Sequence, residues 1–342
     1  MPAYDYAMSR PTCLSYLIFV VLMALVVYLH LGTFLLTSLF GYLALQVFSI
    51  RGSKSMSVAL YLIAVAVIGA GLVYFSNLAY HTMPRIAEIS IPAMVGFAEK
   101  NGIELPFTDY ASLKSTAMDA AREGFAIIGR YATVASFQFV LLVAGLVVPL
   151  SVFLSSGWTA NNGAPAAPDS FYSAVTRELT VRFKTLYESF AKVIGAQIVI
   201  SAINTGLTAV FLIFNSYPYA GLLTTLVFLF GLLPIVGNII SNVVIVGVGF
   251  TFSSRTGVYA LVFLIVIHKL EYFLNSKIVG GRINSPMWLT LIGLLVFERL
   301  MGIPGMILAP VVLHFIKVET SAYRSLPGGR MVHISAAPAC DN

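Results

Sequence analysis

Charged residues are scarce in this 342-residue chain, and cysteines are scarcer still. Only 10% of the residues are charged and 58% are hydrophobic, whereas soluble domains average about 25% charged and about 45–50% apolar. This composition excludes a disordered chain and argues against an ordinary soluble enzyme. The two cysteines, Cys13 and Cys340, stand at opposite ends and form no CxxC pair, haem motif or metal cluster. The net charge of +6 fits an oriented membrane protein, so no nucleic acid is expected as a partner.

Four long stretches contain no Asp, Glu, Lys or Arg: residues 11–50, 55–84, 131–168 and 193–254. One helical crossing of a bilayer needs roughly 20 apolar residues, so these stretches hold about six membrane-length pieces. A β-barrel would show short alternating segments instead. The sequence therefore predicts an all-α polytopic membrane protein. It should have about six full transmembrane helices plus two Pro/Gly-broken re-entrant hairpins, or eight spans, and an amphipathic extracytoplasmic helical region.

Composition divides the chain into five predicted segments. These are three transmembrane helices in 1–84, an extracytoplasmic amphipathic region in 85–130, a fourth transmembrane helix and linker in 131–168, a transport core in 169–320 and a cytoplasmic tail in 321–342. The second segment carries five basic and six acidic residues, a near balance that suits the outer side. Pro84 and Pro92 punctuate it and predict short helices there. Basic residues flanking the spans place both termini on the cytoplasmic side of a bacterial inner membrane.

An amphipathic helix is predicted to begin the transport core, capped by Asp169 or Ser170 and running unbroken into a fifth span that ends near Phe214. Its apolar stripe recurs at helical spacing through Phe171, Val175, Leu179, Phe183, Leu186, Phe190 and Val193. The basic residues are interpreted as lying off this stripe: Arg177, Arg182, Lys184 and Lys192. Such a face either binds lipid or a partner, or packs on its own protein.

Two Pro/Gly breaks interrupt the apolar segments of the last third. Pro234 and Gly237 break residues 219–253, leaving limbs of about 14–15 residues, roughly 22 Å as helix. A hydrocarbon core is ~30 Å thick, so we expect a re-entrant hairpin. Gly302, Pro304 and Gly305 break residues 287–318 in the same way. Counting basic residues favours hairpins over full crossings by two to one, and a span-plus-hairpin pattern in opposite orientations is typical of secondary transporters.

Six residues are candidates for contact with a substrate or a coupling ion: Glu271, Asn275, Asn238, Asn242, Glu298 and Arg299. Ionisable groups within apolar segments are costly and mark functional sites. Glu271 is the first choice and shares a helix face with Asn275, although an interfacial salt bridge is the alternative. Glu298 and Arg299 either serve the site, pair with other charges or line a subunit interface. Gln197 and Asn204 are expected to form ordinary interhelical hydrogen bonds.

Three stretches resemble the autoinducer-2 exporter (AI-2E) family of membrane permeases. They are residues 230–238 (FGLLPIVGN), 271–282 (EYFLNSKIVGGR) and 302–310 (GIPGMILAP). The chain departs from the family at Asn238 and Ser276, where many members have Pro, and at Glu298-Arg299, where small or apolar residues are usual. The resemblance implies export of a small polar signalling molecule as in some members, or cation/proton antiport as in others, and a homo-oligomer.

The leading hypothesis is a permease or secondary transporter that exports a small polar solute, autoinducer-2-like by family resemblance. The alternatives are a cation/proton antiporter that uses Glu271 or Glu298, and a non-transporting membrane scaffold. No GxxxxGK[ST] motif, HExxH motif or nucleophile–base pair occurs, so neither ATP-driven pumping nor an enzyme is expected. No cofactor or metal is expected. The expected partners are membrane lipid, the solute, H⁺ or Na⁺ as an open coupling ion, and further copies of the chain.

Overall fold

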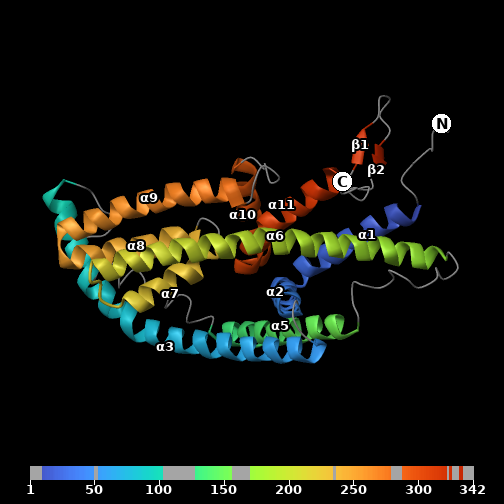
Figure 1. Ribbon diagram of the computed structural model, residues 1–342, viewed down its shortest axis with the longest axis horizontal. Helices are drawn as coiled ribbons and strands as arrows, with labels where there is room; N and C mark the ends of the chain where they lie inside the picture. Colours follow the sequence, from blue (N-terminus) through green and yellow to red (C-terminus); the bar gives the residue numbers. More distant parts are fainter. Residues whose placement is uncertain are drawn as a thin grey trace. The chain divides into compact units, whose positions relative to one another are not determined.

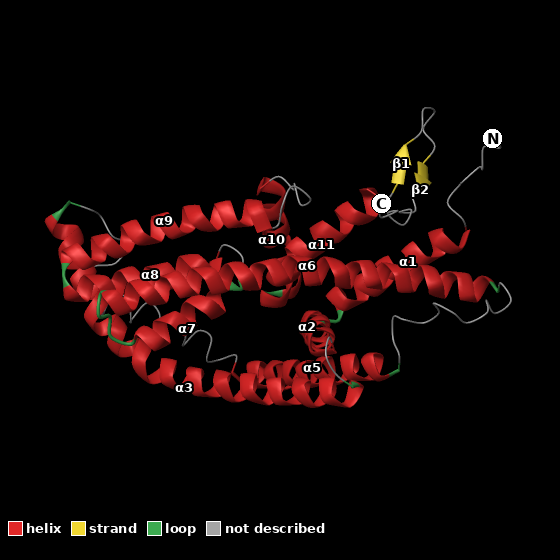
Figure 2. Cartoon of the chain, in the orientation of Figure 1, coloured by secondary structure: helices red, strands yellow, loops and turns green. Residues whose placement is uncertain are grey.

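The computed structural model describes residues 10–49, 53–102, 128–155, 170–233, 236–278, 287–321, 323–325 and 331–333. This described part is almost entirely α-helix, with one small sheet (Figures 1 and 2). The helices, in chain order, are α1 (Arg10–Tyr28), α2 (Gly32–Phe48), α3 (Lys54–Lys100), α5 (Ile128–Leu154), α6 (Phe171–Phe214), α7 (Ala220–Gly231), α8 (Val236–Phe252), α9 (Ser254–Ile278), α10 (Met287–Met301) and α11 (Ile303–Ser321). Strands β1 (Tyr323–Ser325) and β2 (Met331–His333) pair antiparallel. The all-α class expected from composition is confirmed.

A short turn joins the first two helices, which make few contacts with each other. The chain turns between Tyr28 and Gly32, and His30 adopts a left-handed conformation with φ 53°. Gly32 lets the start of α2 approach the second break closely, because an added Cβ would lie 3.2 Å from the Cβ of Met301. The beginning of α2 therefore rests on the connection between α10 and α11.

The third helix is much longer than predicted. α3 continues through positions 84 and 92 to Lys100, so the expected division between residues 84 and 85 has no helix end at it. A proline inside a helix costs about 3 kcal/mol, and burial of the apolar side chains beyond Pro84 offsets that cost. These buried side chains are Ile86, Ile91, Val95 and Ala98. The predicted amphipathic region between residues 103 and 127 and most of the linker predicted before residue 169 lie outside the described residues.

Helix α6 runs unbroken from Phe171 to Phe214, as predicted. Ser170 caps it, since its hydroxyl accepts a hydrogen bond from the Ser173 amide at 3.2 Å. The predicted stripe is mostly inside, although Phe171 is exposed. One part of the prediction is wrong: Arg182 is only 3% exposed. It follows Val175 by seven residues and precedes Leu186 by four, so helical spacing places it on the buried face.

The first predicted break is present. α7 ends at Gly231 and α8 begins at Val236. Pro234 lies outside the described residues, but Gly237 is buried, and a Cβ added to it would overlap the carbonyl oxygen of Phe230. Glycine is therefore needed here for the two limbs to approach each other. Two side chains of α6 hold the end of α7, because Gln197 donates to the Gly231 carbonyl at 2.7 Å and Ser201 to the Phe228 carbonyl at 3.0 Å.

The second break is narrower than predicted. Gly302 alone separates α10 from α11, with φ 64°. Pro304 and Gly305 lie in the first turn of α11, where a proline's missing N–H costs little. A Cβ added to Gly305 would overlap the carbonyl oxygen of Phe297. The same Phe–Gly contact thus closes both helix pairs, which gives the repeat a residue-level counterpart.

In the part of the chain that the structure describes, five helical segments are long and apolar enough to cross a membrane: Arg10–Tyr28, Lys54–Thr82, Ser136–Leu154, Phe171–Phe214 and Ile303–Ser321. The chain is therefore a multi-pass membrane protein. The limbs α7 and α8 are shorter, as expected, but α11 is long enough to span, which weakens the length argument for the second hairpin. Two of the expected spans are not among the five. α2 has only 17 residues, and α9 includes Arg255, Lys269 and Glu271.

The chain divides into two compact units. Unit 1 comprises residues 1–54, 141–194 and 283–342, and unit 2 comprises residues 55–140 and 195–282. The broken pair α10–α11 belongs to unit 1, and α7–α8 belongs to unit 2. The apolar core of unit 2 contains the buried side chains Ile86, Leu212, Tyr217, Leu222, Leu223, Val227, Ile245, Val248, Ala260 and Leu264. This core joins α3 to the first broken pair and to α9.

Candidate functional site

A small polar pocket lies inside unit 2, among α6, α7, α8 and α9. Its lining combines six polar side chains with three apolar ones: Asn204, Thr208, Val227, Ser241, Asn242, Leu264, Ile267, His268 and Glu271. The enclosed space is sufficient for about one water molecule. Val227 and Leu264 also belong to the apolar core, so the pocket adjoins that core.

Helix α6 contributes Asn204 and Thr208, which are four residues apart and share a helix face. They are 6% and 1% exposed. Within the described residues, the side-chain amide oxygen of Asn204 (Oδ1) is buried and has no hydrogen-bond partner. An unsatisfied buried polar group costs about 1–3 kcal/mol. It therefore signals a water, an ion or a ligand group that completes the site.

Helix α9 contributes the only carboxylate among the residues that line this pocket. The Glu271 side chain is 13% exposed, whereas that of His268, one helical turn earlier, is 65% exposed. The His268 Nδ1 and the Glu271 Oε2 are 3.8 Å apart. The carboxylate is therefore largely sheltered, and an exposed imidazole stands beside it.

Helix α8 contributes Ser241 and Asn242, close to the first break. Because Gly237 fixes the approach of α8 to α7, it also sets where these two residues lie. Hydroxyl, amide and carboxylate oxygens from α6, α8 and α9 thus surround one small space. Such a set can accept hydrogen bonds from a polar solute or coordinate a hard cation.

Two of the predicted site residues, Glu271 and Asn242, come together in this pocket. The side chains of Asn238 and Asn275 lie outside the described residues. Glu298 and Arg299 are exposed on α10, in unit 1. Sequence reasoning missed Asn204, Thr208, Ser241 and His268 as pocket residues. A polar pair spaced by four within an uncharged stretch was the available signal for Asn204 and Thr208. Gln197 forms the expected interhelical bond.

A multi-pass helical membrane protein with a polar pocket beside a broken helix pair belongs to the structural class of membrane transporters. Residues 13–325 match the model of the AI-2E family transporter, and the chain belongs to this family. It is 32% identical over 132 residues to the protein named "Putative transport protein YdbI" of Bacillus subtilis (strain 168). That match covers 37% of this chain and 37% of the relative's length.

Proposed function

We propose that this protein is a secondary transporter of the bacterial inner membrane that binds its solute at the pocket of unit 2. The observation that carries this proposal is the sheltered Glu271 carboxylate, which faces the same space as the unpartnered oxygen of Asn204. Asn242 lies beside them, on a helix that starts at a Pro/Gly break. Buried polar groups of this kind are costly unless a ligand or water satisfies them. Asn238 and Asn275 are proposed as further members of the site, because each is spaced by four residues from Asn242 or Glu271 in sequence.

The proposed solute is a small polar molecule, autoinducer-2-like, and the proposed direction is export. Both follow from the family, and the pocket supplies side chains that accept hydrogen bonds from hydroxyl groups. Because its space holds about one water molecule, the proposal requires the pocket to widen when such a solute binds. Glu271 accepts from the solute or carries the coupling proton. The chain's amino and carboxyl ends are both proposed to be cytoplasmic.

A second candidate is cation/proton antiport. The observation that favours it is size, since the space holds about one water molecule. An oxygen-lined space of that size suits a bare monovalent cation, with Glu271 exchanging the cation for a proton. The two candidates share the same residues and differ in what crosses the membrane.

Sealed inverted vesicles distinguish the candidates. For solute export, the amount of autoinducer-2 that wild-type vesicles accumulate is measured. For cation/proton antiport, the collapse of an imposed pH gradient on addition of Na⁺ is measured with the same vesicles. Glu271→Gln should lower whichever flux is present by about tenfold or more, since charged hydrogen bonds contribute about 1.5–3 kcal/mol. Asn204→Leu should lower it as well. The matched control is Glu188→Gln, which removes an exposed carboxylate on α6. Unchanged flux in Glu271→Gln would mean that Glu271 serves only as a structural salt bridge. No flux of either kind in the wild-type chain would favour the scaffold alternative.

We also propose that the chain forms homo-oligomers through α10. Exposed Glu298 and Arg299 follow a row of exposed apolar side chains that includes Trp288, Leu291 and Leu295. Charges that face lipid are costly, and neighbouring copies can pair Glu298 with Arg299. Reversing one charge should weaken assembly as measured by cross-linking, and reversing both should restore it.

A further inference from the structure

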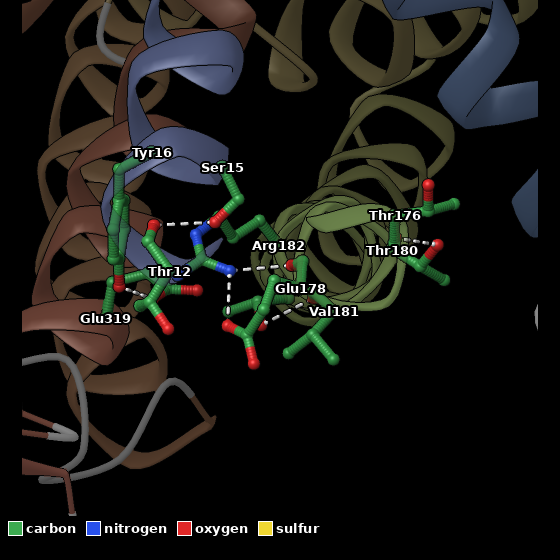
Figure 3. Close-up of polar contacts among 10 residues, drawn as sticks. Thr12, Ser15, Tyr16, Thr176, Glu178, Thr180, Val181, Arg182 and Glu319 are labelled. Atoms are coloured by element: carbon green, nitrogen blue, oxygen red, sulfur yellow. Dashed lines mark hydrogen bonds and ion pairs between the residues drawn. The ribbon is translucent and has the colours of Figure 1, made fainter. Parts of the chain in front are cut away.

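A charged cluster around one buried arginine joins three helices of unit 1, whereas the residues proposed to bind solute belong to unit 2 (Figure 3). We call it the polar clasp, and it consists of Tyr16, Glu178, Arg182 and Glu319. Arg182, on α6, is 3% exposed, and its Nη1 donates to the Glu178 carbonyl at 2.6 Å and to the Glu178 carboxylate at 3.0 Å. An intramembrane or interfacial arginine buried so completely is a functional hypothesis by default.

The clasp extends from α6 to α1 and then to α11. The Tyr16 ring of α1 lies over the guanidinium, with the Arg182 Cζ 3.8 Å from the ring centroid. The Tyr16 hydroxyl donates to the Glu319 carboxylate of α11 at 2.7 Å. Figure 3 shows Glu319 at the hydroxyl end of Tyr16 and Arg182 to the side of the ring. One tyrosine therefore links the helix that returns from the second break to the lead-in of α6.

An aromatic layer lies next to the clasp and uses the same three helices. The Phe19 ring is 5.3 Å from that of Phe183 and 5.2 Å from that of Phe315. Phe183 follows Arg182 in sequence, and Phe19 follows Tyr16 by three residues. The layer holds the three helices in contact, so an exchange of polar partners within the clasp accompanies a small shift of one helix along the others and not their separation.

The clasp is not fully satisfied. Within the described residues, the Arg182 Nε is buried and has no hydrogen-bond partner. The clasp has two carboxylates for one guanidinium, and only Glu178 is paired with it directly. A guanidinium is best satisfied by a carboxylate that accepts from two of its nitrogens at once. Glu319 is one tyrosine hydroxyl away from Arg182, so an exchange that moves Tyr16 aside would bring Glu319 onto the Nε.

We propose that the polar clasp is a two-state contact: here Tyr16 bridges Arg182 and Glu319, and in the second state Arg182 binds Glu319 directly. The exchange moves α11 relative to α1 and α6 within unit 1. Since α11 is the returning limb of the second broken pair, the clasp sets the population of its two positions. The contact itself does not depend on the proposed transport function, whereas its role as a gate does.

Distance measurements between spin labels test the exchange. In a chain carrying Cys13→Ser and Cys340→Ser, labels at Thr180→Cys on α6 and Val318→Cys on α11 occupy exposed positions. The wild-type distribution should contain a major and a minor distance. Tyr16→Phe keeps the ring but frees Glu319, so the ratio of the two should shift by about tenfold toward the minor one. Glu319→Gln should shift it by a similar factor in the opposite direction.

The matched control is Lys184→Gln on the same helix. Lys184 pairs with Glu188 at 3.8 Å, also four residues apart, but both side chains are more than half exposed. This variant should leave the distance ratio unchanged. An unchanged ratio in both Tyr16→Phe and Glu319→Gln overturns the proposal, as does an equal shift in Lys184→Gln. If Glu271→Gln retains flux while the clasp variants shift the distances, the transport site is wrong and the clasp stands.

Discussion

At the scale of single residues, buried polar groups of this chain are of two kinds. Some are held by a backbone carbonyl of a neighbouring helix, as Ser201 is by Phe228. Others lack a partner within the described residues, as the Tyr217 hydroxyl does. The first kind stabilises helix contacts, whereas the second kind costs free energy unless something else binds there. The unpartnered Asn204 and Arg182 atoms lie at the two places where we propose function.

Tyr217 tests this distinction. Its ring lies in the core of unit 2, and burial raises the pKa of its hydroxyl to about 12, so the group is neutral at physiological pH. Tyr217→Phe keeps the ring and removes only an unpartnered hydroxyl. The unfolding free energy should therefore stay the same or rise by up to about 1–3 kcal/mol. The melting temperature in detergent measures this effect and should not fall.

Ser201→Ala is the opposing control. It removes a hydroxyl that donates to the Phe228 carbonyl, and it should lower the unfolding free energy by about 0.5–1.5 kcal/mol. A loss of stability in Tyr217→Phe as large as that in Ser201→Ala would mean that the Tyr217 hydroxyl has a partner. Such a result would also weaken the use of unpartnered atoms as signals of a site.

At the scale of helices, sequence pattern predicted most element ends and some contacts. The turn before Gly32, the length of α6 and the break before Val236 follow from local residues, because caps, apolar spacing and Pro/Gly signals act within a few residues. The passage of α3 through Pro84 and Pro92 was not predictable in this way. It depends on burial of Ile86 in a core shared with distant helices, which no local pattern contains.

Burial of Arg182 was missed for a different reason. The sequence predicts an apolar stripe through Phe183, and the positive charge of Arg182 favours the outer face of the helix. Its spacing from Val175 and Leu186 fits the inner face instead. The pocket was half predicted. Glu271 stood out because a charge is rare in an apolar segment, whereas Ser241 and Thr208 are common residues in membrane helices and carry no such signal.

The matching Phe–Gly contacts in the two broken pairs make an element-scale prediction. Gly237→Ala and Gly305→Ala each place a methyl group onto a carbonyl oxygen of the preceding limb, at Phe230 and Phe297. Each variant should lose about 1–3 kcal/mol of unfolding free energy, as overpacked cores do. Thermal unfolding in detergent, followed by monodispersity on a sizing column, measures the effect.

Gly221→Ala on α7 is the control, since an added Cβ there meets nothing within 4 Å. It should be neutral or stabilising by up to about 1 kcal/mol, because alanine favours helix. An equal loss of unfolding free energy in all three variants would mean that the limbs tolerate no change anywhere. An unchanged unfolding free energy in all three would mean that the close approach of the limbs is not needed.

At the scale of the whole molecule, the polar clasp restricts the topology. It brings the early part of α1, the lead-in of α6 and the last turn of α11 into contact at Tyr16, Arg182 and Glu319. Basic residues near these three stretches separately predict a cytoplasmic position for each of them. Three independent assignments and one set of contacts therefore agree that these stretches share a side of the membrane.

Labelling of single cysteines from each side of the membrane tests this topology. Ser173→Cys at the start of α6 and Ser321→Cys at the end of α11 should react with an impermeant maleimide only in inverted vesicles. Ser254→Cys, between α8 and α9, should react only in intact cells, because α7 and α8 would leave and return on the outer side. All three positions are exposed in the structure. Labelling of Ser173→Cys and Ser321→Cys from opposite sides would contradict the clasp. Labelling of Ser254→Cys from the cytoplasm would mean that α7 and α8 together make one full crossing, so that the first break is a kink within a span and not the tip of a re-entrant hairpin.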